Sequence, residues 1–440
     1  MRVIKGFNRA KAVLSREEPT ESYPVSPALR EGIKKIFGAE LEPEEAVRQI
    51  VEEVRLRGDT ALLDYSLKID GVKLSRLEVT KDEIKRASGE VSQELIAALK
   101  LAAEQIGTFH ALQKDNIWRE IKKPGSGQLI RPLERIGIYV PGGTASYPST
   151  VLMTAIPARV AGVREIILTT PPKASGGVSP VTLVASDIAG VDRIFAVGGA
   201  GAIAALAYGS ESIPKVDKIC GPGNIFVVLA KKLVYGVVDI DGLQGPSEVL
   251  VIADETASPE YCAAELLAQA EHDPLASAIL VTTSRKLAEE VQKEVTRQLK
   301  GLSRQAIAGQ SLQASGVIVV VDSIKEALKL ANLYAPEHLC LMLEGADKYL
   351  DKVSNAGCVF LGKRATVVLG DYVAGPSHVL PTGGTARFSS PLNICDFIKF
   401  INTVSVDEAS FEKLAQAAVT IAKAEGFDAH ARAIEKRLKK

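Results

Sequence analysis

The histidines of this chain are few, and most of them lie where side chains are available for chemistry. Of the five, His110 lies within a helical stretch. The other four, His272, His338, His378 and His430, lie beside carboxylates, Gly or Pro near the ends of predicted elements. Because loops and element ends on a rigid scaffold carry most binding and catalytic residues, these four are candidates for chemistry.

A helix is predicted just ahead of the first candidate. Ser258 and Pro259 are typical of a helix start, and Pro274 marks its stop. Gln269 and His272 would then share one helix face, one turn apart. A carboxamide oxygen and an imidazole nitrogen at this spacing could hold a metal, although the same spacing also fits a solvated surface pair.

Glu337 and His338 form the second candidate. Pro336 ends the helix predicted over residues 325–334, which places both side chains in a loop before a strand over residues 339–343. A carboxylate beside an imidazole gives two proton acceptors that can serve different targets. The alternative is that the pair only caps the end of the helix.

Two further segments present Asp and His from irregular backbone. Residues 370–378 are rich in turn formers and carry Asp371 and His378. Residues 425–430 join two predicted helices, with Asp428 as the N-cap of the second helix. For this junction, a solvated turn without chemistry is the alternative.

Three glycine-rich turns are candidates for binding a phosphate-bearing cofactor. Residues 199–204 read Gly-Ala-Gly-Ala-Ile-Ala, which fits the GxGxxA pattern of dinucleotide sites after a strand and before a helix. No acidic residue ends a following strand at the usual distance, so the match can also be accidental. Residues 140–144 and 220–224 each follow a strand-like run and could bring backbone amides to phosphates.

The elements that must position these residues alternate between helix and strand. Residues 43–114 have helical periodicity with little Gly or Pro. Strand-like runs separated by helical stretches follow, over residues 136–140, 165–169, 193–197 and 225–229, and then 248–252, 278–282, 316–321, 339–343 and 358–361. Such alternation predicts parallel sheet, here in two blocks. Helices return over residues 407–424 and after Gly426, and they could form an arm.

We therefore predict an α/β fold with two Rossmann-like parallel-sheet domains, a helical N-terminal segment and a helical C-terminal arm. The N-terminal segment would span residues 1–24. A discontinuous first α/β domain would combine residues 25–138 with residues 248–392. Residues 139–247 would form the second, NAD-binding α/β domain, and residues 393–440 the arm.

The composition narrows the class of function. The chain has 440 residues, of which 46% are hydrophobic, and Lys plus Arg equals Asp plus Glu at 53 each. Without net charge, no global field favours nucleic acid or an acidic membrane, so we expect a small ligand. Charges interrupt the N-terminus and every apolar stretch is short, so we expect neither a signal peptide nor a membrane span. The five cysteines form no CxxC pair, which suits buried thiols in the cytoplasm.

Taken together, these segments resemble the histidinol dehydrogenase family, over nearly the whole chain and in order. The resemblance runs through residues 139–144 (Tyr-Val-Pro-Gly-Gly-Thr), 214–218 (Pro-Lys-Val-Asp-Lys), 221–224 (Gly-Pro-Gly-Asn), 245–248 (Gly-Pro-Ser-Glu), 269–274 (Gln-Ala-Glu-His-Asp-Pro), 335–339 (Ala-Pro-Glu-His-Leu), 370–372 (Gly-Asp-Tyr) and 425–430 (Glu-Gly-Phe-Asp-Ala-His).

The resemblance implies one zinc ion per subunit. Its ligands would be Gln269, His272, Asp371 and His430, a set of N and O donors that suits zinc. The same four residues, together with Ser247, His338 and Glu425, would contact the substrate L-histidinol. Zinc would position the substrate instead of activating water.

The resemblance also implies a four-electron oxidation, in which L-histidinol passes through L-histidinaldehyde to L-histidine with two NAD, in the last steps of histidine biosynthesis. His338 would accept the alcohol proton, and Glu337 would activate the water that hydrates the aldehyde. Tyr139, Gly201 and Asn224 match cofactor-contacting positions, but the family usually has Gln where Gly201 stands. Arg-Ala-Thr-Val over residues 364–367 also replaces a stretch that commonly reads Thr-Pro-Glu-Ala.

Members of this family are expected to be homodimers with shared active sites. The arm, exchanged between subunits, would bring Glu425 and His430 to the partner's site. Two alternatives remain open from the sequence. One is a paralogue with the same scaffold and metal set that oxidises another small polyol or amino alcohol, such as a sulfonated diol. The other is a non-catalytic NAD-binding or metal-binding protein.

Overall fold

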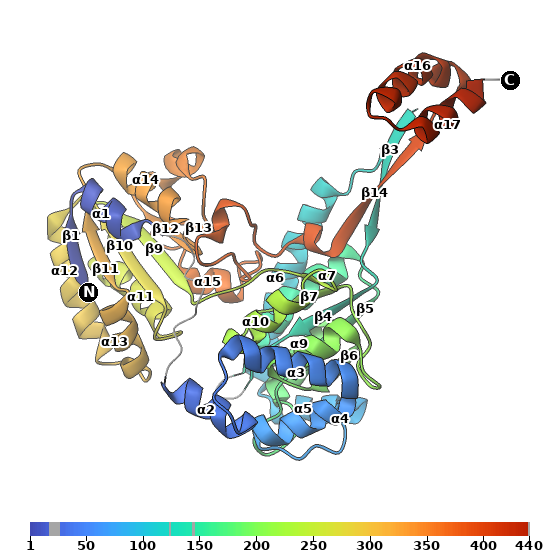
Figure 1. Ribbon diagram of the computed structural model, residues 1–440. Coiled ribbons are helices and arrows are strands. Elements are labelled where there is room, and N and C mark those ends of the chain that lie inside the picture. Colours follow the sequence, from blue (N-terminus) through green and yellow to red (C-terminus); the bar gives the residue numbers. More distant parts are fainter. Residues whose placement is uncertain (17–26, 123–124, 143–145, 439–440) are drawn as a thin grey trace.

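The computed structural model describes residues 1–16, 27–122, 125–142 and 146–438. Its strands form a six-stranded sheet, a five-stranded sheet and a three-stranded ribbon. Figure 1 shows the two larger sheets in separate lobes, and the ribbon projects from the lobe of the five-stranded sheet. The prediction of an α/β fold with two parallel sheets is confirmed.

The six-stranded sheet is parallel throughout, with the order β1-β11-β10-β9-β12-β13. Its lobe contains β1 (Arg2–Lys5), α1 (Phe7–Leu14), β9 (Glu248–Ala253), α11 (Pro259–Ala270), β10 (Ser277–Thr282), α12 (Arg285–Leu299), α13 (Gln305–Ala314), β11 (Val317–Val320), α14 (Ile324–Tyr334), β12 (His338–Met342), η2 (Ala346–Lys352), β13 (Cys358–Leu361) and α15 (Val367–Tyr372). The central strand β9 is buried along its whole length, as its continuous apolar sequence requires. The strand order reverses between β9 and β12, which is the switch point of this sheet.

The five-stranded sheet is also parallel and has the order β6-β5-β4-β7-β8. It is built from β4 (Arg135–Tyr139), α7 (Pro148–Ala161), β5 (Glu165–Thr170), α8 (Pro180–Ala189), β6 (Arg193–Ala196), α9 (Gly199–Tyr208), β7 (Lys218–Cys220), α10 (Ile225–Val234) and β8 (Asp239–Ile240). Here the order reverses between β4 and β7.

The predicted strand over residues 225–229 is wrong, because this run is the start of α10. The Asn224 side chain accepts hydrogen bonds from the backbone N–H groups of Phe226 and Val227 and so caps the helix. The strand before it is the three-residue β7. A short apolar run that is buried on all sides has no periodicity that distinguishes a strand from a helix.

The helices that follow the N-terminal segment cover the five-stranded sheet. They are α2 (Pro27–Phe37), α3 (Pro43–Arg57), α4 (Asp59–Tyr65), η1 (Ser66–Asp70), α5 (Lys81–Glu90) and α6 (Gln93–Ile117). Ile50 and Val54 of α3 share a core with Ile203 of α9, and Ile106 of α6 shares a core with Leu152 of α7. The predicted division, which joined residues 25–138 to residues 248–392, therefore differs from the packing in the structure.

The N-terminal segment belongs to the other lobe and begins with a strand. β1 pairs in parallel with β11 at the edge of the six-stranded sheet. α1 then packs through Ala10 and Leu14 into the core on one face of that sheet. The segment was predicted as helical, and only its second part is a helix in the described residues.

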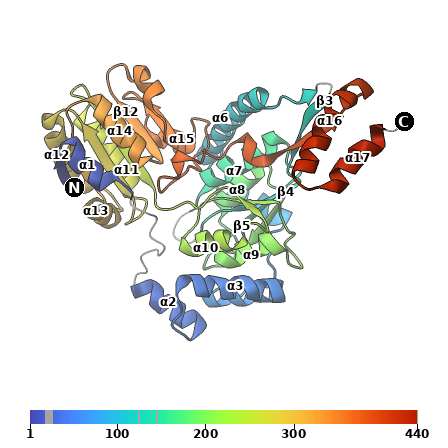
Figure 2. The ribbon, with the colours of Figure 1, turned by 45° about the horizontal axis from the view of Figure 1, so that its top comes forward.

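The C-terminal arm has a β-ribbon as its stem and helices at its tip. β14 (Ile398–Ser405) pairs antiparallel with β3 (Gly125–Pro132), to which β2 (Ile121–Lys122) is added. η3 (Thr385–Arg387) and η4 (Ile394–Phe397) precede the stem, and α16 (Glu408–Ala424) and α17 (Asp428–Leu438) follow it. Figures 1 and 2 show the tip held away from both lobes. The predicted arm exists, but its helical part begins only at residue 408.

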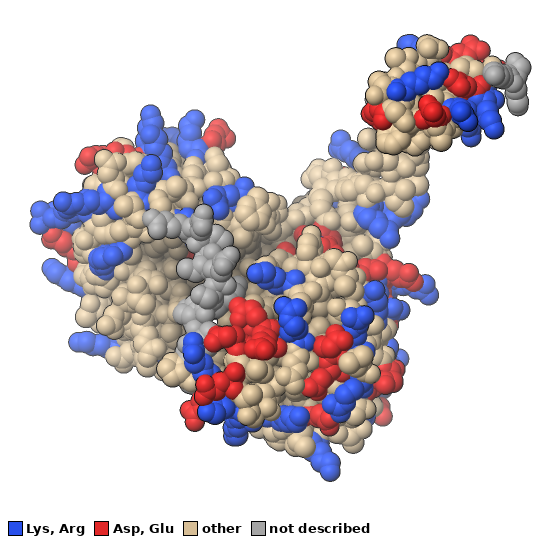
Figure 3. All heavy atoms as spheres, viewed as in Figure 1, with Lys and Arg blue, Asp and Glu red and all other residues tan. Residues whose placement is uncertain are grey.

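Charged groups of both signs lie side by side on the visible face of the five-stranded lobe and on the tip of the arm (Figure 3). Among the described residues, no helix is long and apolar enough to cross a membrane.

Candidate active site

Glu337 and His338 lie at the amino end of β12, beside the switch point of the six-stranded sheet. α14 ends at Tyr334, and Ala335 then takes a left-handed conformation with φ 51°. Among the described residues it is the only non-glycine with positive φ, and such strained positions cluster at functional sites. With Pro336 it turns the chain directly into β12, so that both candidate side chains are buried at the sheet edge.

The imidazole of His338 has one committed and one uncommitted nitrogen. Its Nδ1 lies 3.0 Å from the backbone carbonyl oxygen of Glu248, so Nδ1 carries the proton and donates it. Nε2 is buried and has no hydrogen-bond partner, with Asp371 Oδ1 at 3.4 Å. Burial lowers the pKa of His338, but the carboxylates of Glu337 and Asp371 outweigh it and raise the pKa well above its usual value. The raised pKa favours the protonated ring beside these two carboxylates, and His338 would act as a base from its neutral form, in which Nε2 is the nitrogen that accepts a proton.

The Glu337 carboxylate is held from the same neighbouring strand. Its Oε2 accepts a hydrogen bond of 2.8 Å from the backbone N–H of Glu248, and the same oxygen lies 3.5 Å from His338 Nδ1. Its second oxygen remains for other partners. The two side chains are therefore adjacent and held by the same backbone, and their roles as proton acceptors stay a prediction.

Asp371 lies in the short helix α15 and is fixed from both sides. The buried carboxylate of Glu265, on α11, accepts a hydrogen bond of 3.1 Å from the backbone N–H of Val367 and so holds the start of α15. His378 Nδ1 donates to the backbone carbonyl of Asp371 at 2.7 Å. Burial raises the pKa of Asp371, but the ion pair with His338 and the nearby His378 and His272 lower it below its usual value.

His378 connects the two lobes. While Nδ1 donates to Asp371, Nε2 accepts from the hydroxyl of Thr150 on α7, at 3.3 Å. Ser377 reaches the same helix, because its Oγ donates to the backbone carbonyl of Met153 at 3.1 Å. α7 begins at the carboxyl edge of the five-stranded sheet, just after β4. The amino edge of one sheet therefore lies against the carboxyl edge of the other.

Gln269 and His272 lie at the end of α11, but not on one helix face as predicted. The helix ends at Ala270, so His272 lies beyond it, where its backbone N–H donates to the carbonyl of Gln269. Gln269 is buried, whereas His272 is exposed and close enough to lower the pKa of Asp371. These two residues and Asp371 lie at the same edge of the six-stranded sheet.

Glu425 and His430 are not brought to this edge within one chain. Both are exposed at the junction of α16 and α17, where His430 packs against Phe427 with ring centroids 5.0 Å apart. Figures 1 and 2 place this junction on the projecting tip of the arm. Within one chain, the described residues contain no group of three or more His, Cys, Asp or Glu arranged to hold a metal.

The candidate cofactor residues lie at the carboxyl edge of the five-stranded sheet. Tyr139 ends β4 and Asn224 follows β7, the two strands between which the order reverses. In open parallel sheets, ligands bind at this edge and at this point. The Tyr139 hydroxyl is buried and accepts the backbone N–H of Gly199 at 3.2 Å, and burial raises its pKa to about 12. Of the predicted turn over residues 140–144, residues 143–144 lie outside the described residues.

Gly201 requires a correction. It is buried in the first turn of α9, and a Cβ atom at this position would lie 3.3 Å from Leu62 Cδ2 and 4.0 Å from side-chain atoms of Ile50 and Val54. The side-chain direction therefore points toward α3 and α4 and not toward the sheet edge. In this structure the glycine permits close helix packing, and a cofactor contact from this position is not supported.

Ser247 lies in the segment that connects the two sheets. It directly precedes β9, and its backbone carbonyl accepts the N–H of Ser277 at 2.9 Å. Two buried carboxylates of this lobe were not among the predicted site residues, Glu248 beside Ser247 and Glu265 on α11. Their signal was present, since each is a charged residue on an otherwise apolar strand or helix face, and such residues are rarely buried without a role.

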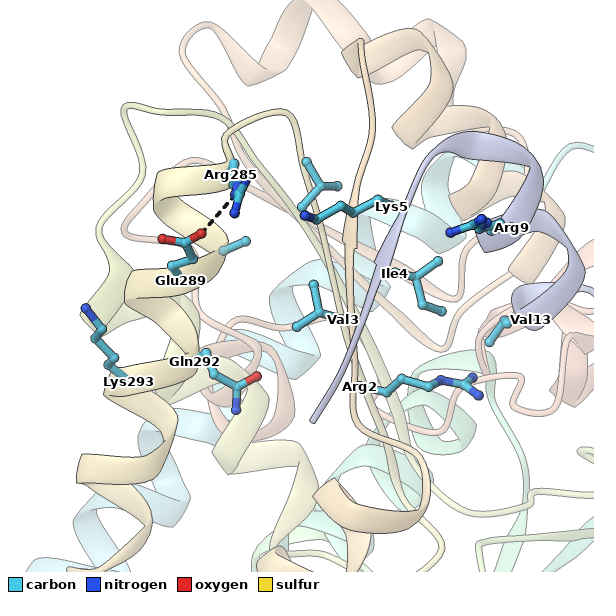
Figure 4. Close-up of a pocket in the computed structure, with 12 residues that line it drawn as sticks. Arg2, Val3, Ile4, Lys5, Arg9, Val13, Arg285, Glu289, Gln292 and Lys293 are labelled. Atoms are coloured by element: carbon cyan, nitrogen blue, oxygen red, sulfur yellow. Dashed lines mark hydrogen bonds and ion pairs between the residues drawn. The ribbon is translucent and has the colours of Figure 1, made fainter.

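An open groove elsewhere holds none of the predicted site residues. Figure 4 shows it between β1 and α12, with Arg2, Lys5 and Lys293 around an apolar floor. The ion pair between Arg285 and Glu289 lies at one end. Because the groove contains no proton acceptor other than this paired carboxylate, we place the candidate active site at the Glu337–His338 edge.

Comparisons with known proteins identify the family of this chain. The histidinol dehydrogenase family model matches residues 38–438. A histidinol dehydrogenase of Dehalococcoides mccartyi is 58% identical over 438 residues, which cover 100% of both chains. One from Clostridium acetobutylicum is 52% identical over 395 residues, 89% of this chain and 92% of the relative.

A solved structure extends the similarity to three dimensions. The crystal structure of histidinol dehydrogenase from Elizabethkingia anophelis has a TM-score of 0.91 and 39% sequence identity, and the match covers 100% of this chain and 98% of that one. By sequence and by fold, the chain belongs to the histidinol dehydrogenase family.

Proposed function

We propose that this chain oxidises L-histidinol through L-histidinaldehyde to L-histidine with two molecules of NAD, in histidine biosynthesis. The observation that carries the proposal is the Glu337–His338 pair, two adjacent proton acceptors on a sheet edge that faces the carboxyl edge of the second sheet. The full-length similarity to histidinol dehydrogenases supports this substrate over another polyol or amino alcohol, and over a protein without activity.

Each oxidation removes a hydride from carbon and a proton from oxygen. In the first oxidation, His338 Nε2 would take the hydroxyl proton, because Nδ1 is already committed to the carbonyl of Glu248, and NAD when bound would supply the hydride acceptor. In the second, Glu337 takes a proton from the water that adds to the aldehyde. The hydrate anion left by this deprotonation would give up a hydride, which a second NAD would accept, and the resulting carboxylic acid would release its proton to solvent to give the carboxylate. Two bases with separate hydrogen-bond partners suit two successive deprotonations.

NAD would bind at the carboxyl edge of the five-stranded sheet, near Tyr139 and Asn224. The switch point between β4 and β7 supports this location, since ligands of open parallel sheets bind at the carboxyl edge where the strand order reverses. The cofactor would then lie across from His338, because Thr150 at this edge already contacts His378 of the other lobe.

Zinc would be held by Gln269, His272 and Asp371 of one subunit together with His430. The donor set of carboxamide, carboxylate and imidazole suits this ion, and the partnerless Nε2 of His338 leaves room for substrate beside Asp371. When bound, the ion would orient the imidazole and amine of the substrate. Gln269, His272 and Asp371 alone do not complete this set of zinc ligands, so His430 of the arm is needed.

A homodimer with shared active sites would complete that set. Glu425 and His430 lie on a projecting arm, away from Asp371 of their own chain. The arm also exposes apolar side chains that a partner would cover: Phe400, Ile401, Val404, Leu414, Ile421 and Phe427. The five unpaired cysteines suit a reducing compartment, and we place the enzyme in the cytoplasm.

The stoichiometry of the reaction tests the proposal. Purified enzyme supplied with limiting L-histidinol and excess NAD should form two NADH for each histidinol consumed and release L-histidine. A ratio of one with accumulated aldehyde would refute the two-step oxidation. Faster NAD reduction with a sulfonated diol than with histidinol would instead favour the paralogue.

A further inference from the structure

The backbone of one residue positions both proposed catalytic side chains. The N–H of Glu248 donates to Glu337 Oε2 at 2.8 Å, and the carbonyl oxygen of Glu248 accepts from His338 Nδ1 at 3.0 Å. Glu248 is the first residue of β9, where the chain enters the sheet from the interlobe segment. Any shift of this residue would therefore move the hydrogen-bond partners of Glu337 and His338 together.

The side chain of Glu248 is buried and depends on a single cation. Its Oε2 accepts a hydrogen bond of 2.7 Å from the guanidinium of Arg16, and the backbone N–H of Gly383 also donates to this carboxylate. Burial and the nearby Glu337 carboxylate raise the pKa of Glu248, whereas Arg16 lowers it. The Glu248 and Glu337 carboxylates thus lie close together, and Arg16 is the ion-pair partner of Glu248 among the described residues.

Arg16 is in turn fixed by the loop that leads to Glu337. Its Nε donates to the backbone carbonyl of Tyr334 at 3.0 Å, and its guanidinium lies 4.0 Å from the centre of the Tyr334 ring. Gly384, with φ 80°, leaves the space for it, since a Cβ there would lie 2.8 Å from Arg16 Cδ. The arginine therefore connects the end of α14, just before the strained Ala335, to the start of β9.

We propose that Arg16 is a positioning residue for the oxidation of histidinol. It comes from the N-terminal segment and contacts neither catalytic side chain, but it fixes Glu248, whose backbone orients Glu337 and His338. The inference rests on the catalytic roles proposed for those two residues. It also gives the N-terminal strand and helix a function, because β1 and α1 anchor the chain that carries Arg16.

Arg16→Met should lower kcat for L-histidinol by about 10- to 100-fold, the usual effect of removing a group that orients a reacting residue. The KM for NAD should stay within about twofold, because the cofactor residues belong to the other lobe. Arg193→Met is the matched control. Arg193, at the start of β6 in the other lobe, makes a bidentate ion pair with Glu78 and contacts none of the proposed site residues, so its loss should leave kcat unchanged.

A double-mutant cycle separates positioning from general stability. If Arg16 acts by holding the Glu248 charge, it becomes dispensable once that charge is removed. Arg16→Met should then cost little turnover in a Glu248→Gln background, although it costs much in the natural one. Equal losses in both backgrounds, or a turnover of Arg16→Met equal to that of Arg193→Met, would overturn the proposal.

Two further variants make every outcome decisive. Arg16→Lys keeps the charge but cannot hold both Glu248 and the Tyr334 carbonyl. It can therefore replace Arg16→Met in the double-mutant cycle if Arg16→Met does not fold. Glu337→Gln tests the underlying assignment. If Glu337→Gln retains full turnover, the proposed catalytic role has failed. If it is inactive while Arg16→Met is fully active, only the positioning role has failed.

Discussion

Two variants with lesions in different parts of the chain would show whether the arm serves its own subunit or a partner. Glu337→Gln damages the buried sheet edge and keeps the hydrogen bond from the Glu248 N–H. His430→Ala damages the exposed tip of the arm, where no buried contact is lost. Each variant alone should be unable to convert histidinol to histidine, because each would lack one part of every site.

The expected recovery follows from the symmetry of a dimer. If the arm of one subunit reaches the site of the other, a mixed dimer has one site with both lesions and one site with neither. Random exchange makes about half of all dimers mixed, and one of the two sites in each is intact, so about a quarter of the natural activity should return. If the arm folds back onto its own chain, every site keeps one lesion and no activity returns.

Histidine formation is measured after the two variants have been mixed at equal concentration, with exchange proven by pull-down of differently tagged chains. Glu337→Gln mixed with Asp371→Asn is the matched control, because both lesions then lie on the sheet edge of one lobe and no intact site can form. Mixed dimers that are isolated and remain inactive would refute the shared site. Activity in the control mixture would refute the assignment of Asp371 to the same subunit as Glu337.

Three other perturbations test single residues. Glu337→Gln should reduce oxidation of supplied L-histidinaldehyde by about 10² to 10⁴ fold and affect the first oxidation less; equal losses would contradict the division between two bases. Gly201→Gln should lower the free energy of unfolding by about 1–3 kcal/mol, because its side chain would enter the packed space beside Leu62; Gly201→Ala should cost less, because its Cβ needs only a small shift of Leu62; a lower KM for NAD without loss of stability would contradict the packing role. Lys231→Met should lower the free energy of unfolding, measured with denaturant, by about 3–5 kcal/mol, because it leaves the buried Asp241 carboxylate without its cation. An unchanged midpoint of the denaturant unfolding curve would contradict this.

The elements that could be predicted from the sequence are those with a strong local signal. Continuous apolar runs gave β9 and β10, and Pro336 marked the turn before Glu337 and His338. β1 had no such signal, because only Ile4 of its four residues is buried and its partner is the distant β11. The helices α3 and α6 have clear periodicity, but a periodic pattern does not say which of two sheets a helix covers. That choice depends on contacts such as those of Ile50 and Val54 with Gly201 and Ile203.

The side chains of the site were recognisable, whereas their supports were not. Glu337 and His338 are adjacent in sequence, but the residue that orients them, Glu248, is about 90 positions away and acts through its backbone. Backbone groups look alike at every position, so the sequence carries no sign of this role. His378 was singled out as a candidate for chemistry, and in the structure both of its nitrogens are committed, one to Asp371 and one to Thr150.

The location of the site at the amino edge of the six-stranded sheet has a structural cause. Ligands of open parallel sheets usually bind at the carboxyl edge, at the switch point. At that edge of this sheet, Asp254 after β9 accepts hydrogen bonds of 3.0 Å from the backbone N–H of Glu344, after β12, and from that of Thr256, so the loops that follow the two strands are tied to each other. The amino edge, in contrast, faces the open carboxyl edge of the five-stranded sheet through His378 and Thr150. The proposed substrate residues at one edge and the proposed cofactor residues at the other are therefore brought toward each other, which would not happen in this orientation if both sets lay at carboxyl edges.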